Sequence, residues 1–166
     1  MTDGLSPLRT GDGRPPRLVH AGASRARAMV LAVLAESLGC RTEHHTTAAG
    51  FVAALLARPA DMAVIDGQMP DLTVGAVVDM IGAVPCRRNL PVIVLRGAAT
   101  ERDVLPARCR TLAEPYSPRD LRAALAAALN AGAAAGYRRT DPVPDVRSRL
   151  SAALNSAPKI SATATM

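Results

Sequence analysis

The sequence predicts an α/β fold in which helices cover both faces of a five-stranded parallel sheet. Two observations lead to this prediction. Short apolar runs alternate five times with segments of helical periodicity along residues 17–131. The runs at Met62–Asp66 and Pro91–Leu95 are also apolar almost throughout, which is typical of parallel strands that are buried on both faces.

The first half of the chain is divided into two strand–helix units by helix caps and helix stops. Ser24 is placed to cap a helix whose apolar residues recur every three or four positions, and Gly39 ends it. A segment of mixed polarity follows, which favours an edge strand, and a second helix ends at Pro59. The expected elements are a strand at 17–21, a helix from Ser24 to about Leu38, a strand at 41–46 and a helix from Thr46 or Thr47 to Pro59.

The second half repeats this pattern around the two buried strands. Pro106 leaves room for one or two helical turns at 98–105. Ser117 followed by Pro118 is a strong helix start, because serine caps helices and proline suits the first helical position. The expected elements are a strand at 62–66, a helix at 72–83, a strand at 91–95, the turns at 98–105, a weak strand at 109–113 and a helix from Ser117 to about Ala131.

The two ends of the chain differ from this middle part in composition. Residues 1–16 are rich in Gly, Pro and Asp, which predicts a disordered arm before a folded domain at 17–131. Residues 132–166 form a basic, Arg-rich tail, which we expect to be partly disordered with a short helix at 145–155. The net charge of +6 fits an anionic partner, and it equally fits an Arg-rich proteome.

Several functional classes lack support in the sequence. The three cysteines, Cys40, Cys86 and Cys109, form no CxxC pair, so we interpret them as buried or idle thiols. The histidines lack metal-ligand spacing, and no phosphate-binding glycine loop or nucleophile motif occurs. We therefore expect no enzyme activity, metal site or cofactor. The absence of a long apolar run and of a leader pattern predicts a cytoplasmic protein without membrane contact.

Four segments of the chain resemble the receiver domains of bacterial response regulators. They are Ala35–Gly39, Val64–Pro70, Leu90–Leu95 and Glu114–Leu121. The resemblance covers about residues 17–131 and implies a flavodoxin-like (βα)5 fold of the stand-alone, chemotaxis-regulator type. It also implies a place in two-component signal transduction, with Asp66 at the position of the phosphoacceptor.

The chain departs from this family where the chemistry of phosphorylation needs partners. The family's Mg²⁺-holding acidic pair is matched by Ala21 and Gly22, its hydroxyl residue by Arg96, and its lysine by Glu114. A carboxylate at the lysine position repels a phosphate. The resemblance therefore implies a degenerate receiver, or pseudo-receiver, in which Asp66 is a vestigial acceptor.

The reversed charges suggest a second interpretation of the same residues. Arg96 and Glu114 end neighbouring strands close to Asp66, so the three side chains are placed to form a charge cluster that fixes the loops without phosphate. Three separate, solvated charges remain the alternative, because exposed ion pairs contribute only about 0–1 kcal/mol.

The basic tail contains a further candidate site. Guanidinium groups bind phosphate through two hydrogen bonds and stack on purines, and a nearby carboxylate accepts from a guanine edge. The tail is similar in composition to the Arg-rich tails of receiver-like proteins that bind cyclic di-GMP, and a solvated basic tail is the alternative. The residues concerned are Arg138, Arg139, Asp141, Arg147 and Arg149.

These observations predict a signalling adaptor of the response-regulator type that works by protein–protein contact without phosphorylation. Its partner would be a histidine kinase, a phosphotransferase, or a motor or regulatory protein, docked by the site loops or by the short fourth helix and fifth strand. A cyclic di-GMP-binding effector is the first alternative, and a regulator weakly phosphorylated at Asp66 is the second. No helix-turn-helix pattern follows the last helix, so we expect no DNA-binding domain.

Overall fold

The computed structural model describes residues 6–97, 105–139, 148 and 155, and its sheet confirms the predicted fold class. Five strands form one sheet in the order β2-β1-β3-β4-β5, and every neighbouring pair is parallel. The expected edge strand, β2, is indeed at an edge. The strands are β1 (Arg17–Ala21), β2 (Arg41–His45), β3 (Met62–Asp66), β4 (Val92–Arg96) and β5 (Cys109–Ala113).

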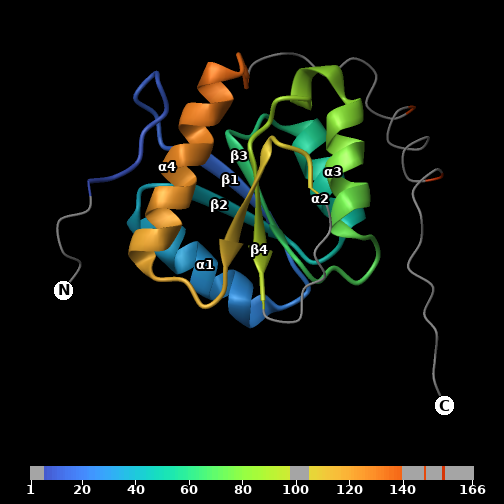
Figure 1. The fold of residues 1–166 in the computed structure, drawn as a ribbon, viewed down its shortest axis with the longest axis horizontal. Helices are drawn as coiled ribbons and strands as arrows, with labels where there is room; N and C mark the ends of the chain where they lie inside the picture. Colours follow the sequence, from blue (N-terminus) through green and yellow to red (C-terminus); the bar gives the residue numbers. More distant parts are fainter. Residues whose placement is uncertain (1–5, 98–104, 140–147, 149–154, 156–166) are drawn as a thin grey trace.

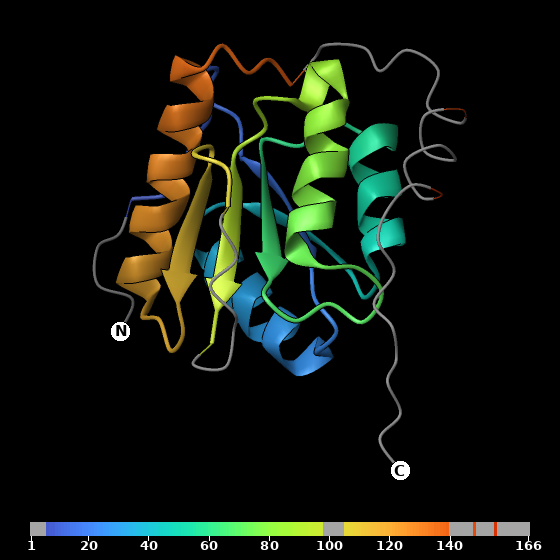
Figure 2. The ribbon, with the colours of Figure 1, turned by 45° about the vertical axis from the view of Figure 1, so that its right-hand side comes forward.

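Helices cover both faces of the sheet, as Figures 1 and 2 show. One face carries α1 and α4, and the other carries α2 and α3. A short 3-10 helix, η1, precedes β4, and none of the described helices is long and apolar enough to span a bilayer. The helices are α1 (Arg25–Ser37), α2 (Ala48–Ala57), α3 (Val74–Ala83), η1 (Pro85–Arg87) and α4 (Pro118–Ala134).

Strand β3 explains why the predicted buried strands are apolar along their whole length. Successive side chains of a strand point to opposite faces of the sheet. Ala63 and Ile65 therefore pack against α2 and α3, whereas Met62 and Val64 pack against α1 and α4. All five residues of β3 are buried. Asp66 is the last of them, so this acid lies at the end of the central strand of the sheet.

The elements differ from the predicted ones mainly at their ends. Helix α4 continues to Ala134, beyond the expected end near Ala131, and β4 lies one residue later than expected. The helical turns expected at 98–105 fall almost wholly on residues outside the described part. In the expected tail helix at 145–155, only Ser148 and Asn155 are described, and both are helical.

The described part of the N-terminal arm, residues 6–16, packs on the domain instead of being disordered. Leu8 is buried, and its N–H donates to the carbonyl of Leu38 at the end of α1 (2.7 Å). A turn follows, in which the N–H of Thr10 donates to the carbonyl of Arg14 (3.0 Å). The prediction of disorder rested on the Gly and Pro content, whereas one apolar residue, Leu8, anchors the described part of the arm.

The chain after α4 also packs on the domain. Gly136 adopts a left-handed φ of 72°, which reverses the chain at the end of the helix. The Tyr137 hydroxyl then donates to the carbonyl of Ala60, in the loop before β3 (2.6 Å). Both terminal segments thus lie at the edge where the strands begin, which we call the basal edge.

Candidate functional site

Asp66 lies at the opposite edge of the sheet, where the parallel strands end. It is the last residue of β3, is only 3% exposed, and aligns with Leu95 of the neighbouring strand β4. One of its oxygens, Oδ1, accepts a hydrogen bond from the Gln68 N–H (3.3 Å). We call this edge the carboxyl edge. Arg96 and Glu114, at the ends of β4 and β5, lie at the same edge, as the sequence predicted.

A guanidinium group joins the two carboxylates of the carboxyl edge, and it belongs to Arg27. Nη1 of Arg27 lies 3.3 Å from Oδ2 of Asp66, and Nη2 donates to Oε2 of Glu114. The two predicted acids are thus joined by a cation that the sequence analysis did not name. The carbonyl of Arg96 accepts a hydrogen bond from the Glu114 N–H (2.8 Å), which aligns the end of β5.

The position of Arg27 in its helix explains why it reaches this site. The N-cap Ser24 accepts from the Arg27 N–H (3.3 Å), so Arg27 occupies the first turn of α1, directly after β1 ends. A cation is unfavourable at the positive end of the helix dipole. The first turn of α1 contains no acid that could compensate this cation. An arginine at such a position indicates an ion pair with an acid elsewhere in the fold, and this was the signal that the sequence offered.

The residues at the end of β1 do not fit the Mg²⁺ that receiver folds hold. Ala21 is fully buried in the core under α2 and α3 and offers no side-chain oxygen. A Cβ at Gly22 would lie 3.1 Å from Cβ of Asp66 and 3.1 Å from Nε2 of His20. Among the described residues, no three His, Cys, Asp or Glu side chains gather as a metal site would require. Asp66 forms an ion pair with the cation of Arg27.

Beside this site, His20 is a buried polar residue whose importance the sequence did not reveal. Its side chain lies on β1 and is 3% exposed, with its ring 5.1 Å from the ring of His44. Burial, with smaller contributions from His44 and Arg27, lowers the pKa of His20 to about 3. Its Nε2 has no hydrogen-bond partner within the described structure. His20 is therefore neutral, and a proton on it would be costly.

A largely apolar surface adjoins the carboxyl edge on helix α1. Met29, Val30 and Val33 are 67%, 57% and 62% exposed, and they share one face of the helix. A hollow of about 320 Å³ lies next to them, between α1 and the loop before α4; it is lined by Ala26, Arg27, Val30, Leu34, Glu114, Pro115 and Tyr116. Sequence reasoning considered only the inward face of this helix and missed the outward one.

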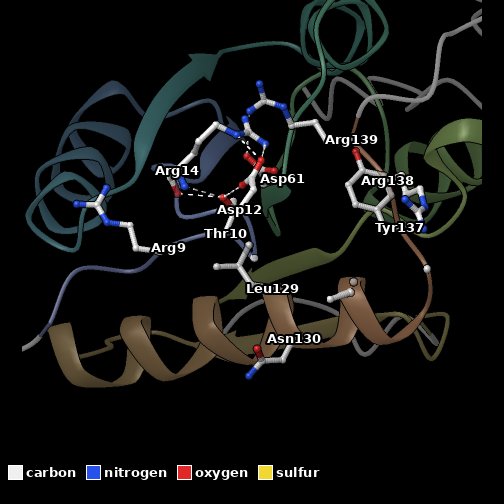
Figure 3. A pocket seen from close by; sticks show the side chains of 14 residues that line it. Arg9, Thr10, Asp12, Arg14, Asp61, Leu129, Asn130, Tyr137, Arg138 and Arg139 are labelled. Atoms are coloured by element: carbon white, nitrogen blue, oxygen red, sulfur yellow. Dashed lines mark hydrogen bonds and ion pairs between the residues drawn. The ribbon is translucent and has the colours of Figure 1, made fainter.

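Two of the arginines expected to bind a nucleotide, Arg138 and Arg139, lie at the basal edge. Arg139 forms an ion pair with Asp61 in the loop before β3 (3.3 Å), and Arg138 is exposed beside it. Figure 3 shows both residues with Tyr137 beside a hollow that the N-terminal arm closes on the other side. The remaining residues of that prediction, Asp141, Arg147 and Arg149, fall outside the described part of the chain.

Comparisons with known proteins agree with this fold. No protein-family model and no curated protein sequence matches the chain. Among solved structures, the chain is similar to the signal receiver domain of a signal transduction histidine kinase from Syntrophus aciditrophicus. The TM-score is 0.64 and the identity 23%, and the match covers 79% of this chain and 98% of that one.

Two further solved structures give the same result. The receiver domain of a sensor histidine kinase from Pseudomonas aeruginosa, with a coordinated magnesium ion, has a TM-score of 0.65 and 19% identity. That match covers 70% of this chain and 98% of the other. A CheY-like response regulator receiver domain from Methylobacillus flagellatus has a TM-score of 0.60 and 19% identity, over 69% of this chain and 98% of the other. The chain thus has the flavodoxin-like fold of response-regulator receiver domains.

Proposed function

We propose that this protein is a degenerate receiver that acts as a signalling adaptor by protein–protein contact, without phosphorylation of Asp66. It has no catalytic role and works without a cofactor. The observation that carries the proposal is the Arg27 bridge, in which one guanidinium group pairs with both Asp66 and Glu114. A receiver signals by adding negative charge to its acceptor aspartate, whereas in this chain Asp66 is paired with the cation of Arg27.

The electrostatics of the carboxyl edge support this proposal. A phosphoryl group on Asp66 would bring further negative charge next to Glu114, against a single cation. Aspartyl phosphate chemistry relies on a hard divalent cation held by several oxygens. Ala21 and Gly22 supply no side-chain oxygen for such an ion. The site is therefore suited to holding its loops in one arrangement rather than to switching between two.

The outward face of α1 is the surface that supports partner docking best. Met29, Val30 and Val33 form an exposed apolar stripe, and such stripes favour association with an apolar helix. Tyr116 lines the neighbouring hollow, together with the charged side chains of Arg27 and Glu114. We propose that a helix of a histidine kinase, a phosphotransferase, or a motor or regulatory protein binds here.

The absence of phosphorylation is tested with a small phosphodonor. Purified full-length protein is incubated with acetyl phosphate and Mg²⁺, and its intact mass is measured against the Asp66→Asn variant. We expect neither protein to gain a phosphoryl group. A gain that occurs in the wild type and is lost in Asp66→Asn would refute the proposal and establish the weakly phosphorylated regulator in its place.

The docking surface is tested with charge substitutions on two helices. Val33→Glu places a charge in the apolar stripe, whereas Ala123→Glu places the same charge on an exposed position of α4. Cross-linking in cells of the source organism followed by mass spectrometry identifies the partners of each variant. We expect Val33→Glu to lose the partner that wild type and Ala123→Glu retain. Retention of the partner by Val33→Glu, or equal loss in both variants, would contradict docking on this face of α1.

The cyclic di-GMP alternative keeps one structural support, since Arg138 and Arg139 line the hollow at the basal edge. Titration calorimetry of the full-length protein with cyclic di-GMP tests it. Heat that disappears in the Arg138→Gln/Arg139→Gln variant would support this alternative. No heat with the wild type would exclude it.

A further inference from the structure

The basal edge of the sheet carries two adjoining hollows lined by arginines. The larger hollow, of about 590 Å³, lies between the N-terminal arm and the chain after α4, and its arginines are Arg9, Arg14, Arg138 and Arg139. The smaller one, of about 390 Å³, lies under the starts of β1 and β2, and its arginines are Arg14, Arg17, Arg41, Arg58 and Arg139. Because Arg14 and Arg139 line both, the two hollows form a continuous concave surface, which we call the basal arginine site.

The parallel sheet itself concentrates this charge. Parallel strands begin at the same edge, and β1 and β2 both begin with arginine. Arg17 and Arg41 are register partners, so their side chains start from directly adjacent positions. The terminal segments then add Arg14 from one side and Arg139 from the other. In Figure 3 these last two side chains reach toward Asp61 from opposite directions.

Three carboxylates of the described structure compensate only part of this charge. Asp12 binds Arg14, with Nε and Nη2 of the guanidinium each 2.5 Å from Oδ2. Asp61 pairs with Arg139, and Glu43 pairs with both Arg17 and Arg58. Of the seven arginines that line the site, three have no carboxylate partner among the described residues; they are Arg9, Arg41 and Arg138. Seven cations thus face three anions, and the site keeps a clear excess of positive charge.

The central arginines are held in place rather than free in solvent. Oδ2 of Asp61 accepts both the backbone N–H of Arg17 (2.7 Å) and Nη1 of Arg139 (3.3 Å). The guanidinium of Arg17 also donates to the carbonyls of Arg58 (3.0 Å) and Pro59 (2.9 Å). Tyr137 fastens the segment before Arg139 through its hydrogen bond to Ala60. Positions fixed before binding reduce the entropy cost of taking up a ligand.

We propose that the basal arginine site binds a small molecule that carries two or more phosphate groups. Guanidinium groups present paired N–H donors that match phosphate oxygens, and several such groups around one concave surface suit neighbouring phosphates. The concave shape favours a compact ligand over a membrane plane or an extended polymer. Pro15 and Pro59 line the smaller hollow and provide an apolar wall for the organic part of the ligand. The site is at the edge opposite Asp66 and does not depend on the adaptor role.

Titration calorimetry on the full-length protein tests the ligand class. The probes are inorganic phosphate, inorganic tripolyphosphate, GDP and cyclic di-GMP, which separate phosphate alone from a nucleotide. We expect tripolyphosphate and at least one nucleotide to bind about tenfold or more tightly than inorganic phosphate, and their affinity to fall as salt rises. No binding of any multiply phosphorylated probe would overturn the proposal. So would binding confined to vesicles of anionic phospholipid or to single-stranded RNA.

Paired variants test the location of the site. Arg14→Gln/Arg41→Gln removes one cation shared by both hollows and one without a partner. Arg25→Gln/Arg119→Gln removes the same net charge from exposed positions on the first turns of α1 and α4. We expect the first variant to weaken tripolyphosphate binding about tenfold or more, and the control to change it less than about twofold. Equal losses would overturn the proposal, and melting temperatures verify that both variants fold.

Discussion

The two edges of the sheet differ in how far their charged side chains are paired. At the carboxyl edge, Asp66 and Glu114 share the single cation of Arg27, and Asp66 is almost completely buried. At the basal edge, arginines outnumber the carboxylates around them, and two hollows keep them open to solvent. At the carboxyl edge, the two acids are therefore paired within the protein. The basal edge keeps the capacity to bind anions.

The largest effect is expected from removing the cation of Arg27 at the carboxyl edge. Arg27→Gln leaves Asp66 buried without its cation, and we expect a loss of about 2 kcal/mol in the free energy of unfolding. This value lies between those of exposed and buried pairs, because the Arg27 side chain is 38% exposed. Urea unfolding measures it, with Arg25→Gln on the same helix as the control.

A double-mutant cycle shows whether this loss comes from the pair with Asp66. In the Asp66→Asn background, Arg27→Gln is expected to cost markedly less, because no buried charge is left without a partner. Strictly additive losses would show that Arg27 and Asp66 do not interact, and the bridge would then have no part in fixing the carboxyl edge.

His20, next to Asp66, makes the stability of the carboxyl edge depend on pH. Its pKa is about 3 in the folded protein and close to 6.5 in the unfolded chain. Between these values the unfolded chain binds a proton that the folded protein does not. Stability therefore falls as pH falls from about 6.5, with a slope that approaches about 1.4 kcal/mol per pH unit.

The His20→Leu variant isolates this effect. Unfolding is measured by urea between pH 7 and pH 5, above the range in which the lowered carboxyl groups of Asp12 and Glu43 titrate. We expect a flatter profile in the variant and no large loss at pH 7, since an unsatisfied buried nitrogen is removed. Identical slopes in the two proteins would contradict a protonation cost at His20.

A smaller effect is expected at the fastening of the basal edge. Tyr137→Phe removes the hydrogen bond to the Ala60 carbonyl, and we expect a loss of about 1 kcal/mol. Burial raises the pKa of Tyr137 to about 12, so the hydroxyl remains a donor throughout the neutral range. Tyr116→Phe is the matched control, and thermal unfolding compares the two. Equal melting temperatures would show that Tyr137 does not hold this segment.

The smallest effect is expected for an ion pair at the basal edge. Arg58 is 69% exposed where it meets Glu43, so Arg58→Gln should change the free energy of unfolding by less than about 0.5 kcal/mol. The same urea experiment as for Arg27→Gln gives the value. A loss as large as that of Arg27→Gln would show that the ion pairs at the basal edge are as strong as the one at the carboxyl edge.

The sequence predicted the sheet and its helices well, because local patterns determine them. The Ser24 and Ser117 caps, the Gly39 stop and the continuous run of β3 each depend on a few adjacent residues. The same patterns placed Asp66 and Glu114 at one edge.

The unpredicted contacts join distant parts of the chain and leave weak local traces. Arg27 was one arginine among many, and its pairing with Asp66 depends on how α1 lies over the sheet. Leu8 and Tyr137 are each a single residue that docks from a largely polar segment. A single residue gives no repeating apolar pattern, so periodicity does not detect it. The exposed apolar stripe of α1 was not predicted, because apolar residues lie on both faces of this helix.

Gly22 has a consequence for how this protein can change over evolutionary time. A Cβ there would lie 3.1 Å from Cβ of Asp66 and 3.1 Å from Nε2 of His20, so an aspartate would fit only if these side chains shifted slightly. It would still face the guanidinium of Arg27 and the carboxylate of Glu114. An aspartate at this position alone would thus cost packing without completing a set of metal ligands.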